Sequence, residues 1–356
     1  MSVTLCTFNA NNLFVRYRFG KTFPGDQTGK SAVTNPKQGF LPMYDPDLFE
    51  LFNPEQRRLM AQTIFRDGTS EPDIICFQEI ESLIALRAFN EEHLERKYEN
   101  ALLVDSRDFR QIDVAILTKK SISILAVRSH VDDIDPTPDS GARPWLFSRD
   151  CFEVELGLPG GRRLTLFINH LKSKFVDTKR FPTPEAQAAE RERANRHRER
   201  QTDRVIEIVR KRFPGTAYQK RLFAVLGDLN DEPTAAPVRR LFDECDLEDV
   251  LTRLPMEPER WTHWWRTKNR VSQIDGLLLS PALARITEGA APVIERRGIS
   301  FKNTLDDGLS GPRQTNFHRI EDDPSPTKVD FRFPRFADVD RERYASDHCP
   351  IFLEIP

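Results

Sequence analysis

Carboxylate, amide and imidazole side chains recur beside short apolar runs of this sequence. The set consists of Asn9, Glu79, His170, Asp228, Asn230, Asp275, Asp347 and His348. Most have an ordinary structural explanation when taken alone, such as a turn at "GDLN" or a cap at "SDH". Asp275 is harder to explain, because a carboxylate inside the apolar run "QIDGLLLS" costs several kcal/mol unless it is paired. The recurrence of such residues at the ends of separate runs therefore predicts one shared site.

The residue types in this set predict a class of reaction. Oxygen ligands such as Asn9, Glu79 and Asp347 suit a hard cation, Mg²⁺ or Mn²⁺. The sequence has no His-x-x-x-His or Cys-x-x-Cys pair of the kind that binds zinc. His170 and His348 would supply an acid and a base, and lysines just after His170 would hold an anion. A metal ion, an activated water and an acid are what hydrolysis of a phosphate ester requires.

Short runs rich in β-branched residues must position these side chains. Strands are predicted at 3–8, 73–78, 113–117, 163–170, 221–228, 274–280 and 349–355. Helices are predicted at 53–68, 81–97 and about 184–212. Because some strands alternate with helices and others are adjacent, we expect an α/β (α+β) sandwich of two mixed β-sheets flanked by helices. We expect a single domain over residues 1–356, with insertions at about 15–50 and 285–345.

The bulk composition narrows the class of protein. With 38% hydrophobic and 30% charged residues, the 356-residue chain is typical of a globular protein. Its net charge of −2 points to no anionic partner, so such a preference must come from local clusters. No apolar run approaches the ~20 residues that cross a bilayer. Because no signal peptide is visible, we expect a cytoplasmic location by default, or secretion if an upstream segment is removed. Cys6, Cys76 and Cys349 fall in predicted strands and are expected to be buried thiols.

A series of motifs along the chain resembles the endonuclease/exonuclease/phosphatase superfamily, which has the DNase I-like fold. The motifs are "TFNANN", "FQEIE", "RQIDVAIL", "INHLKSK", "LGDLND", "SQIDGLLLS" and "SDHCP", and they run from residue 7 to residue 350. A motif such as "GDLN" is weak alone, but the ordered set is specific. The resemblance implies a four-layer αββα sandwich and a Mg²⁺ (or Mn²⁺) cofactor.

The resemblance also implies roles for the matching residues. Asn9, Glu79 and Asp347 would bind the metal ion. Asp228 and Asn230 would position or activate the attacking water.

The same resemblance implies roles for the two histidines. His348, oriented by Asp275, would contact the scissile phosphate or act as the base. His170 would stabilise the phosphate or protonate the leaving group, with Asp113 as the candidate that orients it.

The substrate follows less directly from the motifs. The run "NHLKSK" and the basic helix after it resemble a bacterial nuclease branch of the superfamily, which favours a nucleic acid, DNA in the first place, as partner. The residues expected to bind substrate phosphates are Lys172, Lys174, Arg110, Arg198 and Trp264. Acidic residues are interleaved with the arginines of the helix, so its charged face could also be a solvated, ion-paired surface.

Three hypotheses for the function remain open. The leading one is a divalent-metal-dependent phosphodiesterase, specifically a DNA endonuclease. The second is a phosphatase or phosphodiesterase that acts on a small molecule or a lipid headgroup, which would gain little from polymeric DNA. The third is a binding protein that has kept the fold without catalysis, and the presence of every candidate catalytic group argues against it. The oligomeric state is not indicated by the sequence.

Overall fold

The computed structural model describes residues 2–17, 49–139, 144–254, 260–266, 270–300, 314–315, 318–319, 333–340 and 342–356. The insertion expected at about 15–50 therefore lies largely outside the described residues, and the one at about 285–345 lies partly outside them.

Two six-stranded sheets form the centre of the fold. Across the first sheet the order is β15 (Val293–Ile294), β19 (Ile351–Ile355), β1 (Val3–Leu13), β4 (Ile74–Ile80), β6 (Asp113–Thr118) and β5 (Asn100–Leu103). Across the second it is β11 (Glu248–Asp249), β14 (Asp275–Leu279), β10 (Leu222–Asp228), β9 (Arg163–His170), β8 (Phe152–Gly157) and β7 (Ser123–Arg128). Both sheets are mixed, because β1 and β4 are parallel, as are β9 and β10, while their other neighbours are antiparallel.

Shorter strands form three small ribbons beside these sheets. They are β2 (Val15–Tyr17) with β3 (Phe49–Leu51), β12 (His263–Trp265) with β13 (Arg270–Ser272) and β17 (His318–Arg319), and β16 (Gln314–Thr315) with β18 (Phe333–Pro334). The helices are α1 (Pro54–Ile64), α2 (Leu83–Glu92), α3 (Pro184–Arg212), α4 (Thr216–Lys220), α5 (Ala236–Asp243), α6 (Pro281–Ile286) and the 3₁₀ helix η3 (Val250–Arg253).

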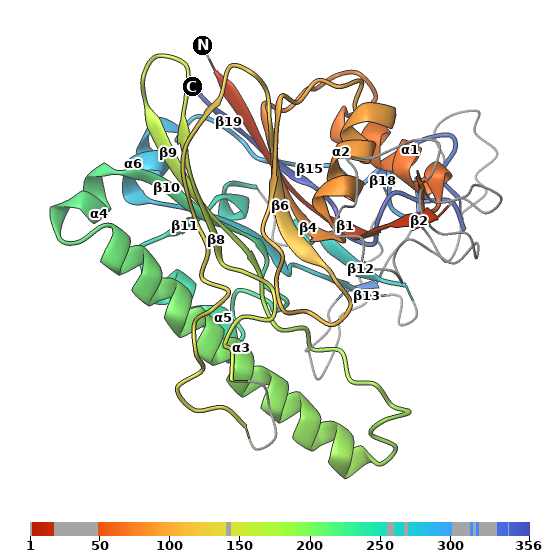
Figure 1. The fold of residues 1–356 in the computed structure, drawn as a ribbon, viewed down its shortest axis with the longest axis vertical. Coiled ribbons are helices and arrows are strands. Elements are labelled where there is room, and N and C mark those ends of the chain that lie inside the picture. Colours follow the sequence, from red (N-terminus) through yellow and green to blue (C-terminus); the bar gives the residue numbers. More distant parts are fainter. Residues whose placement is uncertain are drawn as a thin grey trace, which may run out of the picture.

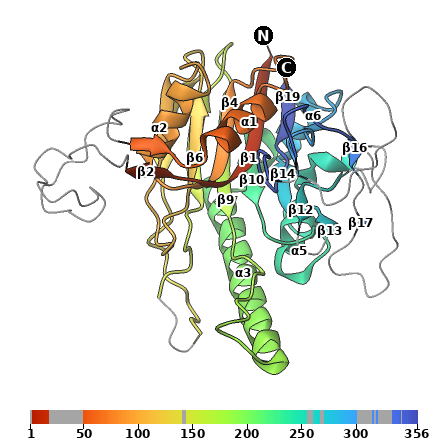
Figure 2. The same cartoon turned by 90° about the vertical axis from the view of Figure 1, so that its right-hand side faces the viewer.

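Helices α1 and α3 begin where the sequence places good caps. Asn53 accepts a hydrogen bond from the Gln56 N–H before α1, and Thr183 accepts one from the Ala186 N–H before α3. A proline follows each cap, at a position whose N–H would have no partner inside the helix. The predicted long helix at about 184–212 is confirmed as α3, which extends beyond the sheets in both views (Figures 1 and 2).

Alternation along the strands builds the layers of the fold. On β1, Leu5 belongs to the core between the two sheets, whereas Phe8 faces the core shared with α1 and α2. On β10, Leu226 points into the central core, whereas Phe223 packs in a third cluster with α3 and α5. Successive side chains of a strand point to opposite faces, so both faces of each sheet are buried. Figure 1 shows α1 and α2 beside one sheet and α3 beside the other, which confirms the predicted αββα sandwich.

All five cysteines are free and buried, as the sequence predicts for Cys6, Cys76 and Cys349. Within the described parts of the chain, no helix has the length and apolar character needed to span a membrane.

Candidate active site

Strand direction brings the polar strand-end residues to one end of the sandwich. Val3 lies opposite Ile355 at the other end, where the two termini meet (Figure 2). The carboxyl ends of the parallel strands β1 and β4 therefore point away from the termini, and the antiparallel strands β19 and β6 start beside them. In the second sheet, Asp228 lies in register with both His170 and Asp275. Six strands thus deliver polar side chains to one corner.

Backbone irregularities aim two of these side chains. The register between β1 and β4 shifts after Asn9, and Asn11 and Asn12 have φ values of 46° and 62°. The register between β4 and β6 shifts around Glu79, whose φ is 64°. Such bulges turn a side chain out of the regular alternation of a strand. The Asn12 N–H then donates to Glu79 Oε2 at 3.1 Å, which fixes the carboxylate at the strand end.

Gly227 allows the two central strands to approach at the site. Its φ is 120°, and a Cβ atom at this position would lie 2.1 Å from the carbonyl oxygen of Asn169. A side chain here would therefore push β10 away from β9. The glycine of "LGDLND" keeps Asp228 beside His170.

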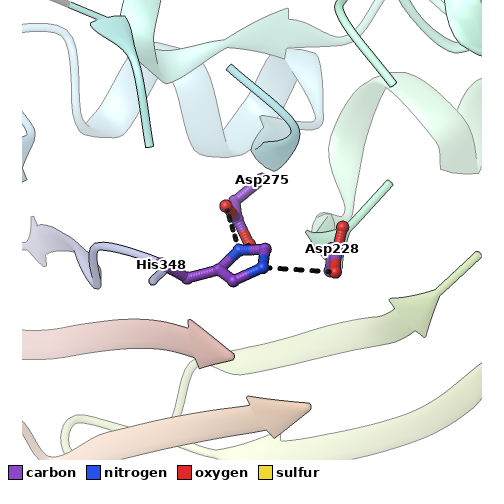
Figure 3. Close-up of side chains that lie close together, drawn as sticks. All are labelled: Asp228, Asp275 and His348. Carbon is purple, nitrogen blue, oxygen red and sulfur yellow. Dashed lines mark hydrogen bonds and ion pairs between the residues drawn. The ribbon is translucent and has the colours of Figure 1, made fainter. Parts of the chain in front are cut away.

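His348 lies between two carboxylates (Figure 3). Its Nδ1 lies 2.9 Å from Asp275 Oδ2, and its Nε2 lies 3.9 Å from Asp228 Oδ2. Burial alone would lower the pKa of His348, but the charges of Asp275, Asp228 and Asp347, with the Asp275 hydrogen bond, raise it well above its usual value. The ring is therefore an imidazolium at neutral pH, with Nδ1–H donated to Asp275 and Nε2–H facing Asp228.

His170 is buried beside the same Asp228 but has the opposite electrostatics. Its Nε2 lies 3.4 Å from Asp228 Oδ2 and 3.9 Å from Glu79 Oε1. Its Nδ1 is buried without a hydrogen-bond partner among the described residues. Burial, and then the positive charges of Arg149 and Arg110, lower the pKa of His170 well below its usual value. At neutral pH this imidazole is therefore uncharged.

Asp228 links the two imidazoles. Burial raises its pKa to about 7; the charge of His348 opposes this rise, and the negative charges of Asp275 and Glu79 add to it. Asn9 Nδ2 donates to Asp228 Oδ2 at 3.0 Å, and the Asn230 N–H donates to Asp228 Oδ1 at 2.9 Å. A fixed carboxylate whose pKa is close to neutral is suited to exchange a proton with water.

The corner around Glu79 and Asp347 has the donor atoms of a divalent-metal site. Burial, and then the Asp347 carboxylate, raise the pKa of Glu79, so this corner carries negative charge that a cation would stabilise. By contrast, Asp228, Asp275 and His348, whose ligand atoms lie within 4.8 Å of one another, already satisfy each other. A doubly protonated imidazole has no lone pair for a metal. The donor set therefore fits a hard cation at Glu79 and Asp347, with the Asn9 amide nearby.

Cationic side chains flank this corner. Lys172 follows β9, and burial, with the charge of Arg149, lowers its pKa to about 8. Lys174 Nζ lies 2.8 Å from Asp231 Oδ1, and the half-exposed Arg110 lies 3.3 Å from Asp108. The structure places all three beside the strand ends that carry His170 and Asp228.

The prediction that Arg198 binds substrate is wrong. Its side chain is 0% exposed and donates twice to Asp231 Oδ2, at 2.7 and 3.1 Å. It also donates to the Lys172 carbonyl, and the buried Gln201 accepts the Lys172 N–H. The arginine on the inner face of α3 therefore holds the loop that carries Lys172, rather than a substrate.

The prediction that Trp264 contacts substrate is also wrong. Its side chain is 1% exposed and belongs to the core between the sheets. The cause is a short antiparallel pairing: His263 bridges to His348, and the Trp264 N–H donates to the Asp347 carbonyl. Pairing directs the indole inward, so the aromatic residue serves the packing of the site.

Asp113 does not orient His170. Its carboxylate accepts hydrogen bonds from the N–H and the hydroxyl of Ser106, while the His170 ring pairs with Asp228 and Glu79. Burial raises the pKa of Asp113 to about 6, and the Ser106 hydrogen bonds oppose this rise. Its position at the start of β6 is near the site, but its side chain ties down the preceding loop.

Two residues of the site escaped the sequence analysis. The His263 ring lies against the His348 ring, with centroids 4.7 Å apart, and its Nε2 lies 4.0 Å from Asp347 Oδ2. Buried Arg149 donates to the His170 and Leu171 carbonyls and to Asp108. His263 stands in "WTHWW", a segment in which Trp264 rather than the histidine was predicted to contact the substrate. Arg149 stands in no motif, so no local signal marks it.

Comparisons with known proteins agree with this fold. No curated protein matches the sequence. The human Nocturnin catalytic domain, solved with a bound sulfate anion, has 12% identity and a TM-score of 0.54, over 99% of this chain and 93% of that one. A truncated TDP2 from Caenorhabditis elegans has 14% identity and a TM-score of 0.50, over 99% and 96%. An endonuclease/exonuclease/phosphatase family protein from Bacteroides thetaiotaomicron has 15% identity and a TM-score of 0.51, over 99% and 97%.

At these identities the solved structures show a shared fold. The family comparison goes further, because the model of the Endonuclease/Exonuclease/phosphatase family matches residues 6–348, nearly the whole chain. The strand-end motifs, the two packed sheets and this match agree: the chain belongs to the endonuclease/exonuclease/phosphatase family, whose members hydrolyse phosphoesters.

Proposed function

We propose that this chain is a divalent-metal-dependent phosphodiesterase that acts on nucleic acid, in the first place a DNA endonuclease. The observation that carries the proposal is the pair of opposite imidazoles around Asp228. One is charged and held by Asp275 at 2.9 Å, and the other is neutral at 3.4 Å from the same carboxylate. A fixed positive charge beside a base with a pKa of about 7 suits attack of water on a phosphodiester.

Each residue of the site has a separate role in the proposed hydrolysis. Asp228 accepts a proton from the attacking water as the water oxygen bonds to phosphorus, with Asn9 and Asn230 fixing the carboxylate. His348 stabilises the negative charge that grows on the phosphoryl oxygens. A divalent cation bound by Glu79, Asp347 and Asn9 would withdraw charge from the phosphate.

The leaving oxygen must receive a proton when its bond to phosphorus breaks. A neutral His170 can donate a hydrogen bond to a phosphoryl oxygen but has no second proton to give. Lys172 is a better-matched acid, because burial lowers its pKa to about 8. We therefore assign the leaving-group proton to Lys172.

Circular DNA offers the sharpest test, because it has no ends for an exonuclease. Supercoiled plasmid and circular single-stranded DNA would be incubated with Mg²⁺, Mn²⁺ or EDTA, with His348→Gln in parallel. The proposal expects metal-dependent cleavage of circular DNA that the variant loses. Intact circles in every reaction, with release of phosphate or alcohol from small phosphoesters, would contradict it and favour a small-molecule phosphoesterase.

A further inference from the structure

The two most exposed large apolar side chains in the described part of the molecule flank the candidate active site. Phe109 is 83% exposed and Phe175 is 69% exposed. Phe109 lies in the loop before β6, and Phe175 lies in the loop that follows His170. Leaving a phenylalanine in water forfeits about 1.5–3 kcal/mol of burial, so two such rings at one site indicate a binding role.

The two loops are built in the same way. In the first, buried Arg149 pairs with Asp108 at 2.9 Å, and Asp108 also pairs with the outer Arg110 at 3.3 Å. One carboxylate thus serves two guanidinium groups. The guanidinium of Arg110 thus stands next to Phe109 and shares its carboxylate with a buried arginine.

The second loop repeats the arrangement on α3. Buried Arg198 pairs with Asp231 at 2.7 Å, and Asp231 also pairs with the outer Lys174 at 2.8 Å. Again one carboxylate serves two cations, and the ammonium group of Lys174 belongs to the residue next to Phe175. Each loop therefore presents an exposed aromatic ring beside a cation that shares its carboxylate with a buried arginine.

Buried hydrogen bonds hold the loops in place around the reacting corner. Arg149 donates to the His170 carbonyl at 3.0 Å and to the Leu171 carbonyl, so it ties the Asp108 loop to the end of β9. Arg198 donates to the Lys172 carbonyl at 2.6 Å, three residues before Phe175. The rings are thus carried by fixed backbone and not by free loop tips.

We propose that Phe109 with Arg110, and Phe175 with Lys174, form an aromatic rim that binds unpaired bases of a single-stranded nucleic acid on either side of the scissile phosphate. This inference rests on the proposed function, because it names the substrate class of the same site. Bases in single strands expose their faces to aromatic rings, while neighbouring cations contact the backbone. In a duplex those faces are stacked on one another, so the phenylalanine rings cannot stack on them. A lipid surface is the competing partner for exposed aromatic residues.

Binding tests the inference without relying on catalysis. One labelled oligonucleotide would be titrated, single-stranded and as a duplex, in EDTA, against the wild type, Phe109→Ala, Phe175→Ala and the double variant. We expect each single variant to bind the single strand about five- to hundredfold more weakly, the range for one lost stacking contact. Phe109→Trp and Phe175→Trp should retain binding. Leu125→Ala, which changes an exposed side chain on the edge strand β7, should bind like the wild type.

Several outcomes would overturn the inference. Unchanged affinity of the double variant for the single strand would do so, and so would an equal loss of affinity for duplex. Binding to phosphatidylglycerol vesicles that the alanine variants lose, without any change in oligonucleotide affinity, would assign the rim to lipid instead. If the wild type cleaves no nucleic acid but shows the expected single-strand affinities, the proposed hydrolysis fails while the rim stands.

Discussion

The end of β9 and the start of β19 each place a buried histidine next to Asp228, and the two differ in charge. His348 has Asp275 at 2.9 Å, and its pKa is raised. His170 also lies beside carboxylates, but burial first, and then the positive charges of Arg149 and Arg110, lower its pKa. Burial acts on both in the same direction. The difference shows that the sign of the neighbouring charge, rather than burial, decides which ring is an acid at neutral pH.

The largest effect is expected when the His348 environment is made to resemble that of His170. Asp275→Asn removes the charge but keeps the size, so the pKa of His348 should fall and the ring should lose much of its positive charge at neutral pH. We expect a loss in kcat of about 10²–10⁴-fold, as for other carboxylates that orient a catalytic histidine. Single-turnover hydrolysis of an oligonucleotide measures it. Asp246→Asn, at an exposed position in the loop after α5, is the matched control. A kcat within twofold of the wild type would show that catalysis does not need the Asp275–His348 pair.

The converse change removes the cation beside His170. Arg149→Met removes the buried partner of the Asp108 carboxylate and leaves it only the half-exposed Arg110, which should cost about 3–5 kcal/mol of unfolding free energy. In the folded fraction the pKa of His170 should rise, because a positive neighbour is gone. Urea unfolding measures the free energy of unfolding, and a pH titration of the imidazole measures the pKa of His170. Arg96→Met, in an exposed ion pair, should cost no more than about 1 kcal/mol. Equal stabilities of these two variants would show that Arg149 does not stabilise the fold through its buried ion pair with Asp108.

His170 itself should matter through hydrogen bonding and not through charge. His170→Gln keeps an N–H donor, so we expect a loss of about tenfold, whereas His170→Ala should lose about 10²–10³-fold. His348→Gln should behave differently, because no amide replaces a positive charge. The kcat values of these variants show whether each ring acts through a hydrogen bond or through its charge. Equal losses for the glutamine variants at the two positions would mean that the rings have the same role.

The pH dependence of activity should reflect the different protonation states that the site residues need. Asp228 must be ionised to accept a proton, so activity should rise about tenfold per pH unit up to its pKa of about 7. Lys172 must stay protonated to supply the leaving-group proton, and His348 must stay protonated to keep its charge. Activity should therefore fall above the Lys172 pKa of about 8 and again above the raised pKa of His348. Initial rates across the pH range measure both limbs. In Asp275→Asn the fall that belongs to His348 should move to lower pH, because Asp275 raises the pKa of that ring. If neither alkaline step moves, His348 does not set either of them.

Much of this arrangement could be predicted from the sequence. Polar residues at the ends of apolar runs, such as Asp228 after "FAVLG" and His348 before "CPIFLEI", mark strand termini because a buried strand tolerates few charges. Strand periodicity and the helix caps likewise predicted the sheets and helices that form the layers. The motifs then identified the family.

The errors have a common physical cause. Sequence spacing placed Arg198 on a basic helix near the site, but it could not tell which face of α3 packs inward against Asp231. Trp264 was misjudged because its orientation follows from pairing with a segment more than eighty residues away. Arg149 and His263 were missed because their partners, too, are distant in sequence. Long-range pairing of this kind is visible only in the folded chain.

The protonation of the two imidazoles at neutral pH is the most direct test of the account. Long-range ¹H–¹⁵N spectra of ring-labelled protein, with His170→Gln and His348→Gln to assign the signals, distinguish one protonated ring nitrogen from two. The account predicts that His348 is doubly protonated and that His170 is neutral. A neutral His348, or a charged His170, would contradict the division of labour on which the proposed reaction depends.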